Sequence, residues 1–310
     1  MASRWARRAA GVLAVLMAAG CGPAATAAGH QHGESARPGQ GSPGGLPGTP
    51  GRPSPTPTPT PTPAPAPPPA TVVLSRFRAA DGSVVTLAAF AGPVSFRLHA
   101  GSGDPGYPAL SVLHAGPAIG PDEHRRLLAA FNGGFKLSAG AGGYEQEGHV
   151  ISPLIPGRAS LVIDRSGAAA IGVWGHGLPR PGEAVYSVRQ NLTLLVNHGR
   201  VTAAAADWGL WGATLGGGEF VARSALAQGA AGPLIFAGSM SASPADIAAA
   251  LIHAGAVKGM ELDINPEWVQ LDVARNPGHA PTAAIPGQQR PANQYLIGWI
   301  RDFITALAPP

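Results

Sequence analysis

The chain has 310 residues, enough for one large domain or two small ones, and its composition changes sharply near residue 70. Its 21 basic residues exceed its 17 acidic ones, but the surplus lies in the first 69 residues, so residues 70–310 are expected to form one electroneutral domain. A nucleic-acid binder needs surplus Lys and Arg to displace phosphate counterions, so nucleic acid is excluded as an expected partner.

The N-terminus has the pattern of an export signal. Three arginines within the first eight residues precede an uncharged run over residues 9–20, which is too short to span a bilayer as a mature helix. Cys21, the only cysteine, follows Ala18-Ala19-Gly20, which resembles the lipobox of bacterial lipoproteins. That resemblance implies that residues 1–21 are a signal peptide and that a lipid on Cys21 anchors the chain at the outer face of the cytoplasmic membrane. The alternative is ordinary cleavage nearby, followed by secretion.

A linker is expected to follow the signal peptide. Residues 22–69 are rich in Gly, Pro, Ser, Thr and Ala, and they cannot bury enough apolar surface to offset the entropy of ordering. The run from Pro53 to Pro69 alternates proline with Ser, Thr or Ala, which favours an extended polyproline II conformation. The segment is therefore predicted to be a disordered spacer between the membrane and the domain.

From Thr71 onward, short β-rich segments alternate with glycine-containing turns. A helix is predicted over residues 121–131, because Pro121 suits the first helical position and Asp122 and Glu123 lie near the positive end of the helix dipole. Strands are predicted before it at residues 71–77, 83–89, 93–99 and 109–114. Two hairpins are predicted after it, with strands at residues 159–164 and 168–174, and at residues 192–196 and 200–202.

A second helix has the clearest signal in the chain. Ser243 is its N-cap, Pro244 takes the first position, and an alanine-rich body ends before Gly255. A strand over residues 257–265 is predicted next, and apolar spacings of three and four over residues 296–307 predict an amphipathic C-terminal helix. These elements indicate an α+β domain with a mixed or antiparallel sheet and few helices.

The strand predicted over residues 257–265 carries the most informative polar residues. Side chains alternate along a strand, so Glu261, Asp263 and Asn265 should share one face. Two neighbouring carboxylates can divide acid and base or nucleophile roles, which makes Asp263 and Glu261 the candidate catalytic residues. The alternative is structural, with both carboxylates on a solvent-facing edge strand or paired with arginines.

Two glycine-containing turns are candidate anion sites. In Asn132-Gly133-Gly134, adjacent glycines allow successive N–H groups to point at one anionic oxygen. Gly216-Gly217-Gly218 is followed by Arg223, whose guanidinium could bind a phosphate. Neither turn is specific alone, and each is also typical of a plain connection. The sequence contains no zincin, serine-hydrolase or P-loop motif, which removes the support for those classes.

Several segments of the chain, taken in chain order, resemble motifs of the phosphodiester glycosidase family. Residues 131–135 are similar to its Asn-Gly-Gly-Phe turn, residues 158–172 to its Arg-x-x-Ile-Gly segment, and residues 189–199 to the stretch before a hairpin. Residues 222–225 are similar to Arg-Thr-Ala-Ile-Gly, and residues 245–263 to a helix and strand ending in Leu-Asp-Gly-Gly. The resemblance implies hydrolysis of sugar-1-phosphodiesters in envelope glycans or related glycoconjugates. It implies catalytic carboxylates at Asp263 and Glu261, and sugar or phosphate binding at Asn132, Gly133, Gly134, Arg158 and Arg223.

The chain departs from the family beside Asp263. The family has two glycines and a serine where this chain has Ile264-Asn265-Pro266, and it commonly has Asn where this chain has Glu261. Larger side chains there reshape the floor of the pocket. The alternative function is therefore a non-catalytic lipoprotein that binds an envelope glycan or sugar phosphate. No cofactor is expected, although a divalent cation bridging Asp263 and a phosphate stays open.

Overall fold

The computed structural model describes residues 68–212 and 217–310. The signal peptide, Cys21 and nearly all of the linker over residues 22–69 lie outside this range, so the expectations for them stay predictions. The described residues belong to one compact unit, an α+β domain with three sheets and few helices, which is the predicted class. No described helix has the length and apolar character needed to cross a membrane.

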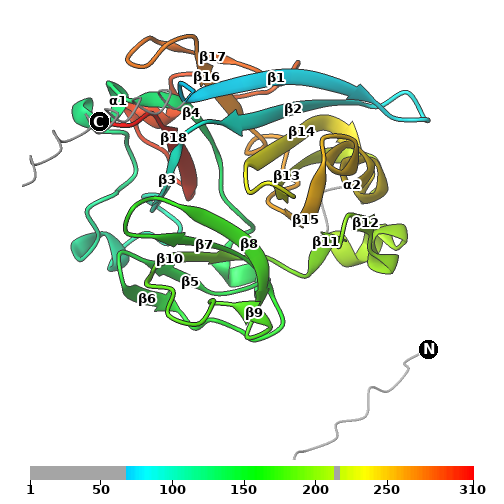
Figure 1. Cartoon of the computed structure of the whole chain (residues 1–310), viewed down its shortest axis with the longest axis horizontal. Helices are drawn as coiled ribbons and strands as arrows, with labels where there is room; N and C mark the ends of the chain where they lie inside the picture. Colours follow the sequence, from blue (N-terminus) through cyan, green and yellow to red (C-terminus); the bar gives the residue numbers. More distant parts are fainter. Residues whose placement is uncertain (1–67, 213–216) are drawn as a thin grey trace, which may run out of the picture. The chain divides into compact units, whose positions relative to one another are not determined.

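The largest sheet has seven strands, and α2 (Pro244–His253) packs on it (Figure 1). All its neighbouring strands are antiparallel. In spatial order they are β1 (Thr71–Arg78), β2 (Val84–Ala91), β14 (Leu234–Ala242), β13 (Val221–Gly229), β15 (Ala256–Glu261), β11 (Leu194–Asn197) and β12 (Arg200–Val201).

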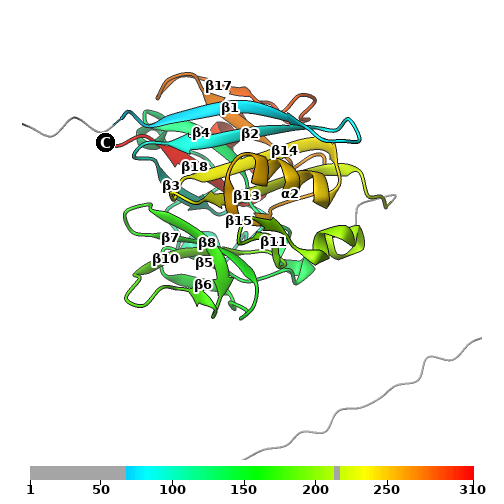
Figure 2. The ribbon, with the colours of Figure 1, turned by 45° about the vertical axis from the view of Figure 1, so that its right-hand side comes forward.

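Two smaller sheets complete the domain (Figure 2). The six-stranded sheet has the order β6 (His149–Ser152), β5 (Tyr144–Gln146), β10 (Val185–Gln190), β7 (Ala159–Asp164), β8 (Ala169–Trp174) and β9 (Gly177–Leu178). The five-stranded sheet has the order β17 (Pro281–Ala283), β16 (Leu271–Ala274), β4 (Leu127–Asn132), β18 (Phe303–Leu307) and β3 (Ser95–His99). Only the short contact of β8 with β9 is parallel among the described strand pairs.

One hydrophobic cluster draws residues from all three sheets. The ring of Phe131 on β4 lies 5.2 Å from that of Phe236 on β14 and 5.7 Å from that of Phe90 on β2, between ring centroids. Leu161 on β7 belongs to the same cluster. This shared core brings the ends of β4, β13 and β15 close together, and the candidate site lies there.

The signals of helix α2 and of the two predicted hairpins are confirmed. Ser243 Oγ accepts a hydrogen bond from Asp246 N (3.1 Å), and Asp246 Oδ2 accepts one from Ser243 N (2.9 Å), which is a capping box. Gly255 follows the helix with φ of +88°, a conformation that favours glycine. β7 pairs with β8, and β11 with β12, both antiparallel.

Two predicted helices are wrong over most of their length. Only Pro121–His124 is helical (α1), and the chain enters β4 at Leu127. At the C-terminus, α3 covers Gln294–Ile297, and Phe303–Leu307 form β18. Every residue of β4 and β18 is buried, because alternate side chains of each strand pack into two different hydrophobic clusters, one on each face of the sheet. A continuous buried apolar run has no period that separates strand from helix.

Other boundaries also differ from the expectations. The strands predicted at residues 71–77, 83–89 and 93–99 are confirmed to within a few residues as β1, β2 and β3. The strand predicted at residues 109–114 is wrong, since the segment contains a 3₁₀ turn at Ala109–Ser111. The strand predicted at residues 257–265 ends at Glu261, so Asp263 and Asn265 belong to the loop that follows β15.

Candidate active site

A cavity of about 1180 Å³ opens beside the end of β15. Asp263 lies in its wall, next to Ile264 and Asn265. The rest of the described wall comes from the same loop, the turn after β4, the segments before β11 and β13, the start of β13, and β14. Its other main lining residues are Phe135, Lys136, Leu192, Leu210, Val221, Ala222, Met240, Glu267 and Trp268.

The backbone at Asp263 is held in place by Ser224 of β13. Ser224 N donates to Asp263 O (2.9 Å), and Ser224 Oγ accepts from Asp263 N (3.1 Å). Asn132 Nδ2, at the end of β4, donates to the same hydroxyl (2.8 Å). Asn191 Nδ2 donates to the carbonyls of Glu261 and Leu262, at 2.8 Å each. Three separate elements therefore fix the position of Asp263.

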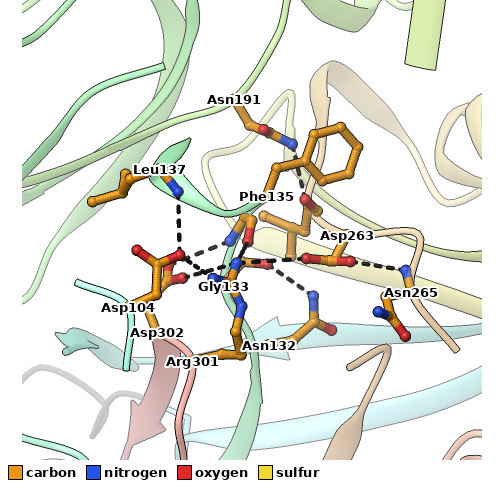
Figure 3. A network of polar contacts seen from close by, with 12 residues as sticks. Asp104, Asn132, Gly133, Phe135, Leu137, Asn191, Asp263, Asn265, Arg301 and Asp302 are labelled. Carbon is orange, nitrogen blue, oxygen red and sulfur yellow. Dashed lines mark hydrogen bonds and ion pairs between the residues drawn. The ribbon is translucent and has the colours of Figure 1, made fainter. Parts of the chain in front are cut away.

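The Asp263 carboxyl is buried, with 3% of the residue exposed. Oδ1 accepts a hydrogen bond from Asn265 N (2.8 Å), and Oδ2 lies 3.9 Å from a terminal nitrogen of Arg301 (Figure 3). Burial raises the pKa of Asp263 to about 7, although the Asn265 N–H and Arg301 both act to lower it. A carboxyl in this state can be ionised or protonated near neutral pH, as acid–base and nucleophilic catalysis require.

Arg301 links Asp263 to a buried ion network (Figure 3). It pairs with Asp104 and donates to Gly134 O (2.9 Å), and its guanidinium lies 4.6 Å from the ring centroid of Trp268. Asp302, the next residue, accepts from Arg189 Nε (2.7 Å). The guanidinium of Arg301 is therefore a buried positive charge near Asp263, and its ion pair with Asp104 offsets the cost of burying it.

The N–H groups of Gly133 and Gly134 both bind Asp302, one at its main-chain carbonyl and the other at its carboxylate. Gly133 N donates to Asp302 O (2.9 Å), and Gly134 N donates to Asp302 Oδ2 (3.3 Å). A Cβ at Gly133 would overlap the Asp302 carboxylate, and one at Gly134 would lie 2.9 Å from Arg189 Cζ. The expectation that these N–H groups face a phosphate is not met here, because Asp302 already occupies them.

The structure pairs Glu261 with Arg223. Glu261 Oε1 lies 2.6 Å from a terminal nitrogen of Arg223, and each residue is 1% exposed. Arg223 Nε also donates to Ala242 O (3.0 Å). Burial raises the pKa of Glu261 to about 8, and Arg223 opposes that rise. Neither residue lines the cavity, so this pair matches the structural alternative, a carboxylate tied to an arginine.

The other two residues expected to bind the substrate, Asn132 and Arg158, do not line the cavity. Asn132 is buried and contacts Ser224 and the backbone of Gln270. Through Ser224 it supports the loop that contains Asp263. Arg158 is half-buried at the start of β7 and does not line the cavity. Among residues 68–212 and 217–310, no group of three or more His, Cys, Asp or Glu side chains is placed to hold a metal ion.

Lys136 is a site residue that sequence reasoning missed. It follows Phe135 directly, lines the cavity and is exposed, and its Nζ lies 5.0 Å from the ring centroid of Trp268. The sequence signal that could have identified Lys136 is its position immediately after the Asn-Gly-Gly-Phe turn. Lys136 supplies a solvent-accessible cation at the cavity, as an anionic ligand would require.

No family model matches the chain, and no curated protein matches it. Among solved structures, the chain is similar to a zebrafish N-acetylglucosamine-1-phosphodiester alpha-N-acetylglucosaminidase catalytic domain, auto-inhibited by its pro-peptide. The TM-score is 0.48 and the identity 13%, over 78% of this chain and 83% of that one. A hypothetical protein from Synechocystis gives a TM-score of 0.48 and 14% identity, over 78% and 64% of the two chains. A Burkholderia pseudomallei protein gives 0.39 and 14%, over 73% and 74%. Similarity at this level is distant and concerns the fold alone.

Proposed function

We propose that this domain hydrolyses sugar-1-phosphodiesters and that Asp263 provides the catalytic carboxylate. The observation that supports this most is the position of Asp263, a buried carboxyl in the wall of a large cavity, with a pKa raised to about 7. The order of motifs that resemble the phosphodiester glycosidase family points to the same residue. The proposed substrates are sugar-1-phosphodiesters of envelope glycans or related glycoconjugates.

The proposed reaction breaks the bond between the anomeric carbon and the phosphate oxygen. The phosphate leaves with the bonding electron pair, and positive charge develops at the anomeric carbon. Ionised Asp263 stabilises that charge, and Lys136 pairs with the phosphate at the cavity. Water adds to the anomeric carbon and releases a proton, which gives free sugar and a phosphate monoester. Because phosphate is a good leaving group, the reaction needs no second carboxylic acid, which fits the engagement of Glu261 by Arg223.

Isotope labelling tests the proposed bond cleavage. The full chain is incubated in ¹⁸O-water with the methyl diester of N-acetylglucosamine-1-phosphate and with a nucleotide sugar. Mass spectrometry should find free sugar together with a phosphate product that carries no label. The reason is that the oxygen of water is added to the anomeric carbon of the sugar. Label in the phosphate product would place the attack at phosphorus and contradict the role given to Asp263.

A second candidate function is binding without turnover. Ile264 and Asn265 both line the cavity where the resembled family has glycines, and the Asn265 N–H is committed to Asp263. A binder should retain affinity for the sugar phosphate, leave the diesters intact, and keep that affinity in Asp263→Asn. Intact diesters together with measurable binding would favour this candidate.

We also propose that the chain is exported and anchored through a lipid on Cys21, with residues 22–69 as spacer. The support is the order of charged, apolar and lipobox-like residues at the N-terminus. Labelling of expressing cells with a fatty-acid analogue should mark the wild-type chain and not Cys21→Ala. An unlabelled wild-type chain found in the culture medium would support secretion instead.

A further inference from the structure

The cavity that contains Asp263 is larger than a sugar phosphate requires. Its volume is about 1180 Å³, whereas pockets for drug-sized ligands measure roughly 300–1,000 Å³. Met240 also lines a second cavity, of about 610 Å³. A ligand bound at Asp263 therefore has room for a substantial group beyond its phosphate.

The charged residues of the described cavity wall lie close together. Among the described residues that line it, three are charged, Lys136, Asp263 and Glu267. They come from two segments that touch, because Lys136 Nζ lies over the ring of Trp268, the neighbour of Glu267. This charged part of the wall can hold the sugar and its phosphate, with Lys136 as the counter-charge.

A group of apolar side chains forms another part of the described cavity wall. The group consists of Leu192, Leu210, Val221, Ala222 and Met240, which belong to other segments of the chain. These side chains offer neither donors nor acceptors to the hydroxyl groups of a second sugar. An apolar wall of this kind stabilises a hydrocarbon chain by removing it from water.

Large apolar side chains are also exposed along the same part of the chain. Leu210 lines the cavity and is 56% exposed, Trp208 is 40% exposed, and Phe220, which lines the second cavity, is 49% exposed. Scattered exposed apolar residues are ordinary in soluble proteins, but Leu210 also belongs to the apolar part of the cavity wall. The apolar wall therefore continues to the surface of the domain.

We infer that the substrate is an amphiphile, a sugar-1-phosphodiester whose second ester group is a hydrocarbon chain. The sugar and phosphate bind beside Asp263 and Lys136, and the hydrocarbon lies along Leu210, Val221 and Met240. This inference rests on the proposed function and names its leaving group. The expected products are free sugar and an alkyl phosphate.

Two diesters of N-acetylglucosamine-1-phosphate, one decyl and one methyl, test the inference with the full chain. Each is used below the concentration at which the decyl compound aggregates. The decyl diester should have a kcat/KM higher by about tenfold or more, mainly through a lower KM, since burial of two methylenes already suffices for that ratio. Equal values of kcat/KM would overturn the inference and favour a polar leaving group such as a second sugar.

Paired variants test where the hydrocarbon binds. The double variant Leu210→Asn, Met240→Gln should reduce the decyl-to-methyl ratio of kcat/KM to near one. Ile297→Asn is the matched control, because Ile297 is 69% exposed and does not line this cavity, and it should keep the full ratio. A ratio that persists in the double variant would overturn the placement of the chain along this wall.

A binding measurement separates this inference from the proposed function. If neither diester is hydrolysed, the proposed function fails, and calorimetric titration with decyl phosphate and methyl phosphate decides the inference alone. Tighter binding of decyl phosphate that is weakened in the double variant would support an amphiphile site. Equal binding of the two phosphates would overturn it.

Discussion

At Asp263, burial and local donors act on the pKa in opposite directions. Burial raises the pKa from 3.8 to about 7, and the Asn265 N–H and Arg301 limit the rise. The folded chain therefore holds this proton more strongly than the unfolded chain does. By linkage, the contribution of Asp263 to the free energy of unfolding falls as pH rises between about 4 and 7.

If ionised Asp263 is required, activity should follow its titration. We expect kcat/KM to rise about tenfold per pH unit below about pH 7 and to level off above it. Unfolding by urea should also show that wild type loses stability relative to Asp263→Asn as pH rises through this range. A pH–rate profile that is flat between pH 5 and 8 would contradict the requirement for the ionised carboxylate.

At the scale of single elements, the turn after β4 joins the site to the C-terminal strand. Gly133 and Gly134 let Asp302, which directly precedes β18, approach the backbone closely, and Arg189 from β10 closes the arrangement. The turn is thus a packing junction between two neighbouring strands of the five-stranded sheet and β10 of the six-stranded sheet.

Gly133→Ala should disturb this junction, because the added Cβ overlaps the Asp302 carboxylate. We expect a loss of about 1–3 kcal/mol in the free energy of unfolding, typical of overpacking, measured by urea denaturation. Gly120→Ala is the control, since nothing lies within 4 Å of its Cβ, and it should change stability by less than about 0.5 kcal/mol. Equal effects of the two substitutions would show that close packing at Gly133 is not the cause.

Local signals predicted some elements, and long-range contacts decided the others. The capping box of α2 and the two short hairpins depend on residues close in sequence, so their patterns were sufficient. β4 and β18 are fully buried strands, and their apolar runs do not distinguish strand from helix. The motif drew attention to Asp263, but the predicted strand ran to residue 265, whereas Asp263 lies in the loop after β15 and lines the cavity. The role of Asp302 could not be predicted, because its partner Arg189 is 113 residues away.

At the scale of the whole domain, the three sheets share one core. Phe131 of the five-stranded sheet contacts Phe236 and Phe90 of the seven-stranded sheet, so neither sheet buries its apolar face alone. We expect the described domain to unfold in a single cooperative transition. Phe131→Ala should lower the free energy of unfolding by about 3–5 kcal/mol and keep one transition in calorimetry. Two separate transitions would contradict a shared core.

The catalytic role of Asp263 can be tested directly by one comparison. Asp272 is a matched control, because burial also raises its pKa to about 7 and it lies outside the cavity, bonded to Gln270 and Gln288. Turnover of a sugar-1-phosphodiester and the Tm should be measured for Asp263→Asn and Asp272→Asn under the same conditions. We expect Asp263→Asn to lose turnover without a fall in its Tm, while Asp272→Asn retains turnover. Full turnover in Asp263→Asn, or a large fall in its Tm, would contradict the catalytic role of Asp263.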